Sequence, residues 1–251
     1  PNTTVALRGA YSWMLGAYRD RSAFLYENAA GNKGTSTTGS LLKHVIPSGE
    51  LSAVASVASG SVRFSSEART SFVEEDVRGA WSDEDAGYRY MTSVMASRQR
   101  ETVVRNDLAL RVAGVAVDVG HESRLRTVNA SHDATHFDAT ASSAYRYELD
   151  VHAGYLTARR SIGGLRADAG LRAEVDRTRI QLETASARTV ARLFLSISGE
   201  WIDARRALMY RLAYSRGINR PGSAMLNPFS MGRDEVDEIV GSPSLSAEGS
   251  D

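Results

Sequence analysis

Residues 165–176, LRADAGLRAEVD, alternate strictly between apolar and polar positions. The odd positions hold only Leu, Ala and Val, and the even positions hold Arg, Asp and Glu apart from Gly170. Because successive side chains of a strand point to opposite faces, this period of two predicts an extended strand with one apolar and one charged face. A helix would spread the same charges around its whole circumference.

This strand is about twice as long as the ~5–6 residues typical of globular sheets. Two environments favour it: a soluble sheet with one face in water, or a barrel wall between lipid and a wet interior. No apolar run approaches the ~20 residues of a membrane-spanning helix, so a helical membrane protein is excluded. The chain begins at Pro1 without a leader, which predicts an internal piece of a longer protein and leaves secretion undecided.

The composition excludes several classes of function. Lys plus Arg and Asp plus Glu number 30 each, so no net charge attracts nucleic acid. The absence of cysteine excludes a disulfide framework and thiolate metal sites. Nucleophile-elbow, phosphate-loop, HExxH and dinucleotide motifs are all missing. The sequence therefore predicts neither an enzyme nor a resident cofactor.

The same alternation recurs along the chain and predicts about ten antiparallel strands. Short turns are expected at residues 47–50, at 113–114 (pairing Val112 with Val115), at 162–164 and at 204–205. The three-residue turn at 162–164 would place Tyr155 opposite Leu171, and a bulge is expected at Gly60. The turn at 204–205 would place Trp201 beside Leu208, with the ring of Tyr210 covering Gly199. The other strands are expected at residues 3–15, 40–46, 51–64, 88–112, 115–125, 145–155, 191–201 and 208–214.

Longer polar stretches are interpreted as loops at residues 29–39, 74–85, 129–143 and 217–240. Short connections thus alternate with mostly long ones, which predicts an all-β, up-and-down antiparallel sheet with two different rims. Outer-membrane barrels have this organisation. Soluble sandwiches, the alternative, use Greek-key crossings and shorter strands.

The end of the chain carries an ordered series of motifs: RLAYSRGINRP at residues 211–221, LNPF at 226–229 and GSPSLSAE at 241–248. The series resembles the barrel domain of TonB-dependent receptors, in the branch called the outer-membrane beta-barrel family. The chain departs from the family pattern at Ser242 and Ala247, where Asn and Pro are usual. The matching residues are Tyr214, Ser215, Arg216, Asn219, Arg220, Pro221, Leu226, Asn227, Pro228, Phe229, Gly241, Pro243, Leu245 and Glu248.

The resemblance implies a plugged barrel of about 22 strands in the cell outer membrane. Residues 1–251 would form a transmembrane wall segment of one barrel domain, without the plug and the closing strands. The family function would be energised uptake of a scarce ligand: a ferric chelate, a cofactor or a glycan. Its partners would be membrane lipid, the protein's own plug and TonB. A soluble secreted adhesion or carbohydrate-binding module and a passive barrel remain as alternatives.

On the barrel interpretation, the charged side chains of the strands line the lumen and hold the plug. The alternative is a solvated outer face of a soluble sheet. The rings of Trp13, Tyr155, Trp201 and Tyr210 are candidates for aromatic girdles, or else ordinary sheet packing. The expected lumen-facing residues are Arg166, Asp168, Arg172, Glu174, Asp176, Glu148 and Asp150.

A cluster in the predicted loop 129–143 contains His132, Asp133, His136 and Asp138. Two histidines with two carboxylates could hold a metal or a metal chelate at the outer mouth. An unstructured loop does not control their geometry, so no metal site is predicted and His132 and His136 are only weak candidates. Residues 219–221 and 226–229 are interpreted as a structured strand exit, with ligand gating as the alternative. Ligand-binding determinants are expected in loops 129–143 and 217–240.

Overall fold

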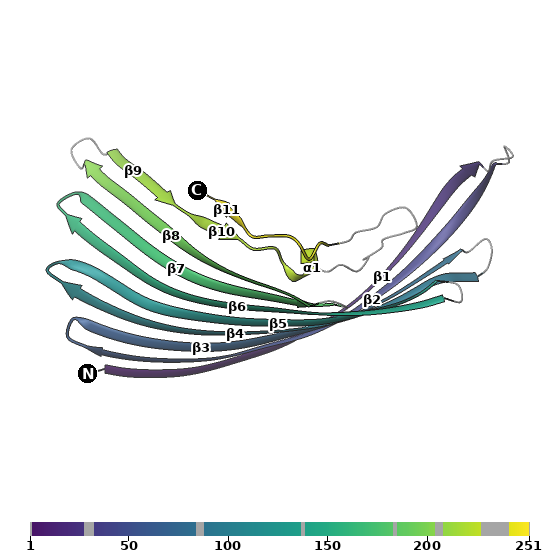
Figure 1. Cartoon of the computed structure of the whole chain (residues 1–251), viewed down its shortest axis with the longest axis horizontal. Coiled ribbons are helices and arrows are strands. Elements are labelled where there is room, and N and C mark those ends of the chain that lie inside the picture. The colour runs from purple at the N-terminus through teal and green to yellow at the C-terminus, as the bar shows by residue number, and fades with distance from the viewer. Residues whose placement is uncertain are drawn as a thin grey trace.

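The computed structural model describes residues 2–27, 33–83, 88–136, 139–182, 185–203, 208–226 and 241–250. Nine strands in this part of the chain form one antiparallel sheet in chain order, as predicted. Figure 1 shows a curved sheet whose concave side is crossed by the last part of the chain. The strands are β1 (Asn2–Glu27), β2 (Lys33–Ser59), β3 (Val62–Asp83), β4 (Tyr88–Val112), β5 (Val115–His136), β6 (Ala139–Ile162), β7 (Leu165–Gln181), β8 (Ala185–Asp203) and β9 (Leu208–Ser215).

Three short elements follow the sheet: β10 (Gly217–Asn219), α1 (Ser223–Leu226) and β11 (Glu248–Ser250). β10 pairs with β11 and neither belongs to the large sheet. Among the described residues, no helix has the length and apolar character needed to cross a membrane.

The registers bring one set of exposed apolar side chains from each strand onto a common face. On β7 these are the odd positions, and they continue sideways into Leu156 of β6 and Leu195 of β8. This face is convex, because the even positions of β7 contact the segment on the concave side. Large apolar side chains on the convex face include Val5, Leu7, Trp13, Leu51, Phe64, Phe72, Val104, Val119, Leu156, Leu171, Val175, Leu193, Leu195, Ile197, Trp201, Tyr210 and Leu212, all of which are exposed.

The apolar band on the convex face has a defined height. On β7 it covers residues 165–175, after which Arg177 and Arg179 follow on the same face. Eleven strand residues tilted by about 45° span about 25 Å, which is the apolar height of an outer-membrane barrel. Trp201 and Tyr210 stack at the rim of this band near the short turns, with ring centroids 5.4 Å apart.

The two-residue turn at Ala113 and Gly114 is confirmed, since Val112 pairs with Val115. Both turn residues have positive φ, 50° and 79°, which is the geometry of a two-residue hairpin whose twist matches its strands. Gly60, with φ of 57°, belongs to a second turn of this kind, because Ser59 pairs with Val62. The expected bulge at Gly60 is therefore wrong, and so is the expected turn at residues 47–50, which lie inside β2.

Two registers differ from those expected. Ile162 pairs with Leu165, so the β6–β7 turn has two residues rather than three, and Tyr155 lies opposite Arg172 instead of Leu171. The one-residue change moves the odd positions of β6 to the concave face, because the side-chain period is two. Trp201 pairs with Tyr210 rather than Leu208. This shift of two residues keeps the apolar sets on one face.

Three predicted loops lie largely within strands. Residues 33–39 belong to β2, residues 74–83 to β3, and residues 129–136 and 139–143 to β5 and β6. Their polar composition reflects strand sections that continue beyond the apolar band, where both faces can meet water. Backbone ladder bonds form there as readily as within the band.

An aromatic ring covers a glycine at two places, but not at the expected one. An added Cβ on Gly199 would meet nothing within 4 Å, whereas one on Gly120 would lie 2.3 Å from Cζ of Tyr155. Gly49 is covered in the same way by Phe72. Gly120 faces the concave side, so Tyr155 does not belong to an aromatic girdle on the convex face.

Candidate functional site

The concave face carries the candidate site, and the chain itself covers part of it. β9 ends at Ser215, and the backbone N–H of Arg216 donates to the carbonyl of Leu195 at 3.0 Å. The chain then turns inward through β10 and α1, and the N–H of Ser242 donates to the carbonyl of Met225 at 2.8 Å. Residues 216–226 and 241–250 are called the inner segment below. Figure 1 shows the inner segment across the concave side of β6 to β8.

Arg220 anchors the inner segment to β7. Its Nη2 bonds to Glu174 and lies 3.3 Å from Oδ2 of Asp176. These two carboxylates are the only charged side chains classed as buried among the described residues. Arg172 Nε bonds to Glu174 at 2.6 Å, and Arg192 bonds to Asp176. Each buried carboxylate thus has two cationic partners, as its removal from water requires.

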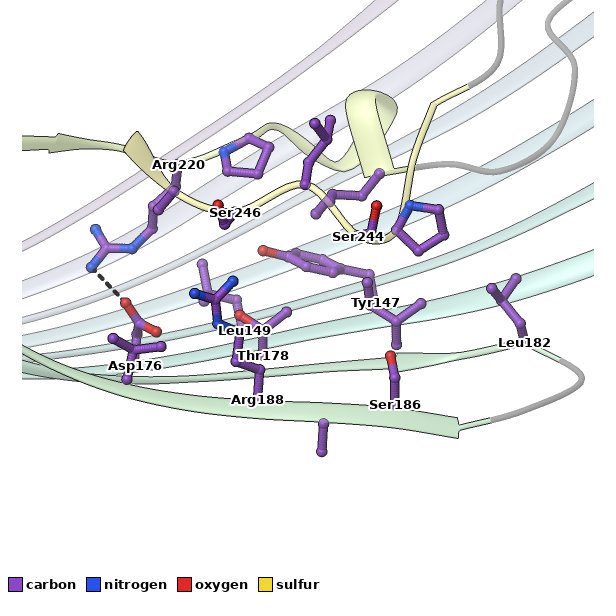
Figure 2. Close-up of a pocket in the computed structure, with 18 of the residues that line it drawn as sticks. Tyr147, Leu149, Asp176, Thr178, Leu182, Ser186, Arg188, Arg220, Ser244 and Ser246 are labelled. Carbon is purple, nitrogen blue, oxygen red and sulfur yellow. Dashed lines mark hydrogen bonds and ion pairs between the residues drawn. The ribbon is translucent and has the colours of Figure 1, made fainter. Parts of the chain in front are cut away.

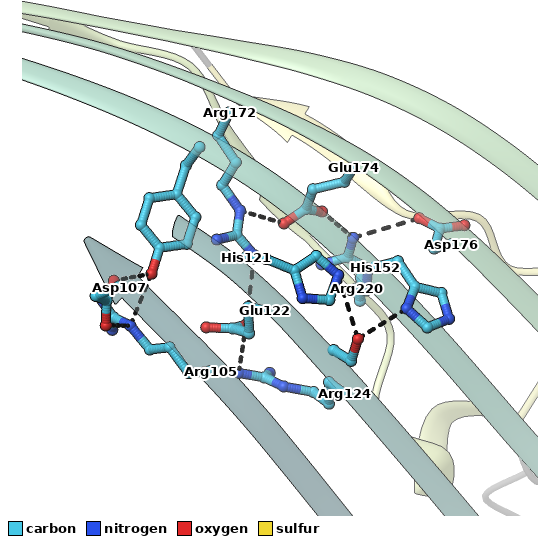
Figure 3. A network of polar contacts seen from close by, with 12 residues as sticks. Arg105, Asp107, His121, Glu122, Arg124, His152, Arg172, Glu174, Asp176 and Arg220 are labelled. Atoms are coloured by element: carbon cyan, nitrogen blue, oxygen red, sulfur yellow. Dashed lines mark hydrogen bonds and ion pairs between the residues drawn. The ribbon is translucent and has the colours of Figure 1, made fainter. Parts of the chain in front are cut away.

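A second network continues from Arg172 toward β4. Two guanidinium groups lie over the Tyr155 ring, with Cζ of Arg105 5.4 Å and Cζ of Arg172 5.7 Å from the ring centroid. The Tyr155 hydroxyl donates to Asp107 and accepts from Arg105 Nε at 2.8 Å. Arg172 also lies 3.4 Å from Glu122. Figure 3 shows these groups as one polar network across the concave face.

A pocket of about 460 Å³ lies between the inner segment and strands β6 to β8. Figure 2 shows its wall: Tyr147 and Leu149 from β6, Thr178 from β7, Arg188 from β8 and Arg220 from the inner segment. Arg188 forms no ion pair with any described residue. The pocket therefore combines an apolar and aromatic floor with the guanidinium group of Arg188.

The core of the molecule lies next to this pocket. Val128, Tyr145, Tyr147, Leu149 and Val151 are nearly inaccessible to solvent, and Leu226 of α1 packs against this cluster. An apolar cluster on the concave face was not expected. It arises because the β6–β7 turn places the odd positions of β6 on the same side as Glu174 and Asp176.

Five of the seven residues expected in the lumen share the concave face: Arg166, Asp168, Arg172, Glu174 and Asp176. Near the short turns, Asp168 bonds to Arg159 and lies 3.4 Å from Arg166. Whether these side chains line a closed lumen stays a prediction.

Glu148 and Asp150 lie on the convex face, so their expected position is wrong. Glu148 pairs in register with Arg179, beyond the apolar band, and contacts Arg146 at 2.6 Å and Arg179 at 3.1 Å. Arg179 and Arg146 stabilise the carboxylate and hold the pKa of Glu148 below its ordinary value. The three residues form an ion cluster at the outer edge of the wall.

His132 and Asp133 belong to β5, so they point to opposite faces and cannot ligate one ion together. Asp138 lies outside the described residues, as does the side chain of His136. Within the described part of the chain, no group of three His, Asp or Glu could hold a metal ion.

The motif residues occupy the strand exit and the inner segment. Tyr214 and Ser215 lie on β9, Asn219 pairs with Glu248, and Leu226 is buried. Asn227, Pro228 and Phe229 fall outside the described residues. The remaining motif residues belong to the inner segment; of these, Arg220, Pro221, Pro243 and Leu245 line the pocket, whereas Arg216 and Gly241 do not.

Sequence reasoning missed Tyr155, Glu122 and Arg105 as members of the network. The available signal was the charge on alternate positions of β4 and β5, which the long polar sections of these strands obscured. The partners of Arg220 are two of the charged residues at even positions of β7, Glu174 and Asp176. The sequence did not indicate that the chain after β9 would fold back onto β7.

Comparisons with known proteins agree with this geometry. A family model described as "Outer membrane protein beta-barrel family" matches residues 65–251. No curated protein matches the chain significantly. The siderophore receptor PiuA from Acinetobacter baumannii is similar in structure, with a TM-score of 0.58 and 8% identity over 86% of this chain and 46% of that one. The copper transporter OprC is similar with a TM-score of 0.53 and 11% identity over 88% and 45%. The chain therefore spans just under half the length of these proteins.

Proposed function

Because the chain belongs to the outer membrane protein beta-barrel family, we propose that it forms part of the wall of a TonB-dependent receptor. The family places it in the cell outer membrane. The receptor takes up a scarce ligand, and TonB supplies the energy by acting on a plug inside the barrel.

One observation carries the proposal: the two faces of the sheet suit two different surroundings. The convex face exposes large apolar side chains over the height of a bilayer core, and the concave face carries the charges. Lipid on one side and water with a polar plug on the other satisfy both faces. A soluble sheet would need a second layer over Leu171 and Leu195, which are 42% and 48% exposed.

The concave charges serve to hold the plug. Arg166 and Asp168 lie near the short-turn rim and Arg172 lies higher on the same strand, and all three side chains are at least partly exposed. A plug that presents complementary charges can dock along this line and be released under force, because exposed ion pairs contribute little individually. On this proposal, the charged face binds the plug reversibly.

The ligand class is proposed to be a ferric chelate, with a cofactor or a glycan as the further candidates. The siderophore receptor and the copper transporter named above share this fold and favour a metal-linked ligand. Determinants of binding are proposed to lie near residues 217–240 and around the pocket that Arg188 and Tyr147 line.

Uptake measurements on the full-length protein test the proposal. The encoding gene is deleted and restored, and accumulation of labelled ferric chelates, corrinoids and oligosaccharides is measured. We expect one class to depend on the gene and to stop accumulating when TonB is removed or a protonophore is added. Accumulation that continues without TonB and without a proton gradient would instead identify a passive barrel.

A second measurement distinguishes the membrane barrel from the soluble alternative. The full-length protein should fractionate with outer membranes and require detergent to stay monomeric. A protein that remains monomeric in plain buffer would be a secreted β-sheet module.

A further inference from the structure

A polar notch interrupts the apolar band on the convex face. It consists of Asn106 of β4, His121 and Ser123 of β5, and His152 of β6. Asn106 pairs with His121, and Ser123 pairs with both Val104 and His152. The notch lies level with residues 173 and 175 of β7, which are the last two apolar positions before Arg177.

Three of the notch residues, His121, Ser123 and His152, contact one another. The rings of His121 and His152 stack with an interplanar angle of 16° and centroids 6.3 Å apart. The Ser123 hydroxyl lies 2.9 Å from Nδ1 of His152 and 3.4 Å from Nε2 of His121. Figure 3 shows the two rings joined through this hydroxyl. The other ring nitrogens, Nδ1 of His121 and Nε2 of His152, bond to no described residue.

Such groups are unfavourable against hydrocarbon. In lipid, an unsatisfied donor or acceptor has no water to bond, so polar side chains on a lipid face need a polar partner at their depth. Both histidines are exposed on the convex face. The notch also lies at the end of the band opposite the two-residue turns, where β4 to β6 continue beyond the band. In outer-membrane barrels the short turns are periplasmic, so this end is the outward side.

Arginine side chains lie directly beyond the notch on the same face. On β4 to β7, the convex positions just beyond the band hold five arginines, namely Arg98, Arg100, Arg146, Arg177 and Arg179, and two acids, Glu148 and Asp150. Arg146 and Arg179 are satisfied by Glu148, and Arg98 lies 3.7 Å from Glu74. Arg100 and Arg177 form no ion pair with a described residue, and Asp150 is the one acid left opposite them.

We propose that the notch and Arg177 bind the phosphate of an outer-leaflet lipid headgroup. Arg177 lies on the neighbouring strand, one position above His152 on the same face, and a guanidinium matches phosphate oxygens in a two-point contact. The imidazole N–H groups donate from below, and the acyl chains lie along Leu156 and Leu171. This site faces away from the concave side, so it does not depend on the proposed uptake function.

The test measures lipid retention by the full-length protein purified in a neutral detergent. Diphosphorylated lipid A is added as the probe, and bound lipid is counted by native mass spectrometry. The variants are His121→Leu/His152→Leu and Arg177→Gln. The matched control is Arg188→Gln, because Arg188 is also exposed at the same height and forms no ion pair with a described residue, but lies on the concave face.

We expect at least a fivefold loss of retained lipid A in each of the two notch variants and no change in the control. The leucine variant should fold, because leucine suits the surrounding face. Equal retention in all proteins would overturn the proposal. Displacement of lipid A by inorganic phosphate at millimolar concentration would also overturn it, since the site would then bind a free anion. If the leucine variant does not fold, Arg177→Gln decides alone, and unchanged lipid retention in that variant overturns the proposal.

Discussion

At the scale of single residues, Arg220 decides whether the inner segment stays on the concave face. Replacement by alanine leaves the buried Glu174 and Asp176 with one cation each, Arg172 and Arg192. Removal of one partner of a buried ion pair costs about 3–5 kcal/mol, and we expect about 2–3 kcal/mol here because Arg220 is 24% exposed.

The Arg220→Ala variant should therefore lower the thermal midpoint in detergent and make residues 216–226 sensitive to protease. Arg220→Lys should recover part of the loss, because a point charge remains. Arg211→Ala is the control, since Arg211 is exposed on the same face and forms no ion pair with a described residue. Equal protease sensitivity in the Arg220 and Arg211 variants would show that the contact with β7 does not hold the segment.

Two adjacent residues of β8 test which face meets lipid. Leu195 lies on the convex face in the middle of the apolar band, and Ser196 lies on the concave face. Arginine on the lipid face at mid-depth costs about 2–4 kcal/mol, whereas the wet face accepts it at little cost. Leu195→Arg should reduce the folded fraction of the full-length protein in lipid vesicles, measured by heat-modifiable gel mobility, and Ser196→Arg should not. The reverse order would assign lipid to the concave face.

At the scale of elements, the turn between β4 and β5 stores strain that can be relieved. Ala113 has φ of 50°, a region that costs an L residue about 1 kcal/mol. Asparagine tolerates this region, so Ala113→Asn should raise the free energy of unfolding by about 0.5–1 kcal/mol. Gly114→Ala should lower it by about 1 kcal/mol through φ alone, because an added Cβ meets nothing within 4 Å. Urea unfolding in detergent measures both, and identical midpoints would contradict the turn geometry.

The strands from β4 to β9 and their order were predictable from the sequence because side-chain alternation reports directly on the two faces of a sheet. Strands β2 and β3 were not, since the expected turn at residues 47–50 lies inside β2 and the expected strand 51–64 contains the turn between them. Residues 165–176 have the expected strand geometry. The turn at residues 113–114 was also predictable, since the parity of the flanking strands requires an even loop. Sections beyond the apolar band were not predictable, because residues such as Ser131 and Thr135 continue a strand through backbone bonds that leave no trace in hydropathy.

The β6–β7 register shows why alternation alone is insufficient. Apolar odd positions on both strands suggested an odd loop, on the assumption that all apolar residues face one way. Tyr147 and Leu149 instead pack under the inner segment on the concave face. An apolar residue in a strand can face either lipid or a local protein core. Only the pairing of Ile162 with Leu165 shows which of the two the odd positions of β6 face. For the same reason, Glu148 and Asp150 were expected on the concave face but lie on the convex one.

At the scale of the whole molecule, the open edges of the sheet govern its behaviour. β1 and β9 each pair with one neighbour in the described sheet, and β9 covers β8 only from Ser196 to Asp203. A bilayer has no water to satisfy unpaired backbone groups, so a spanning sheet must close.

Residues 1–251 produced alone in neutral detergent should therefore associate through the open edges of β1 and β9. Light scattering coupled to size-exclusion chromatography should show oligomers, with rapid hydrogen exchange along β1. The full-length protein should be monomeric and protected along β1, since further strands then complete the wall. A monomer of residues 1–251 with slow exchange on β1 would mean that nine strands can close on themselves, and the wall would then be a small complete barrel with too little room for a plug.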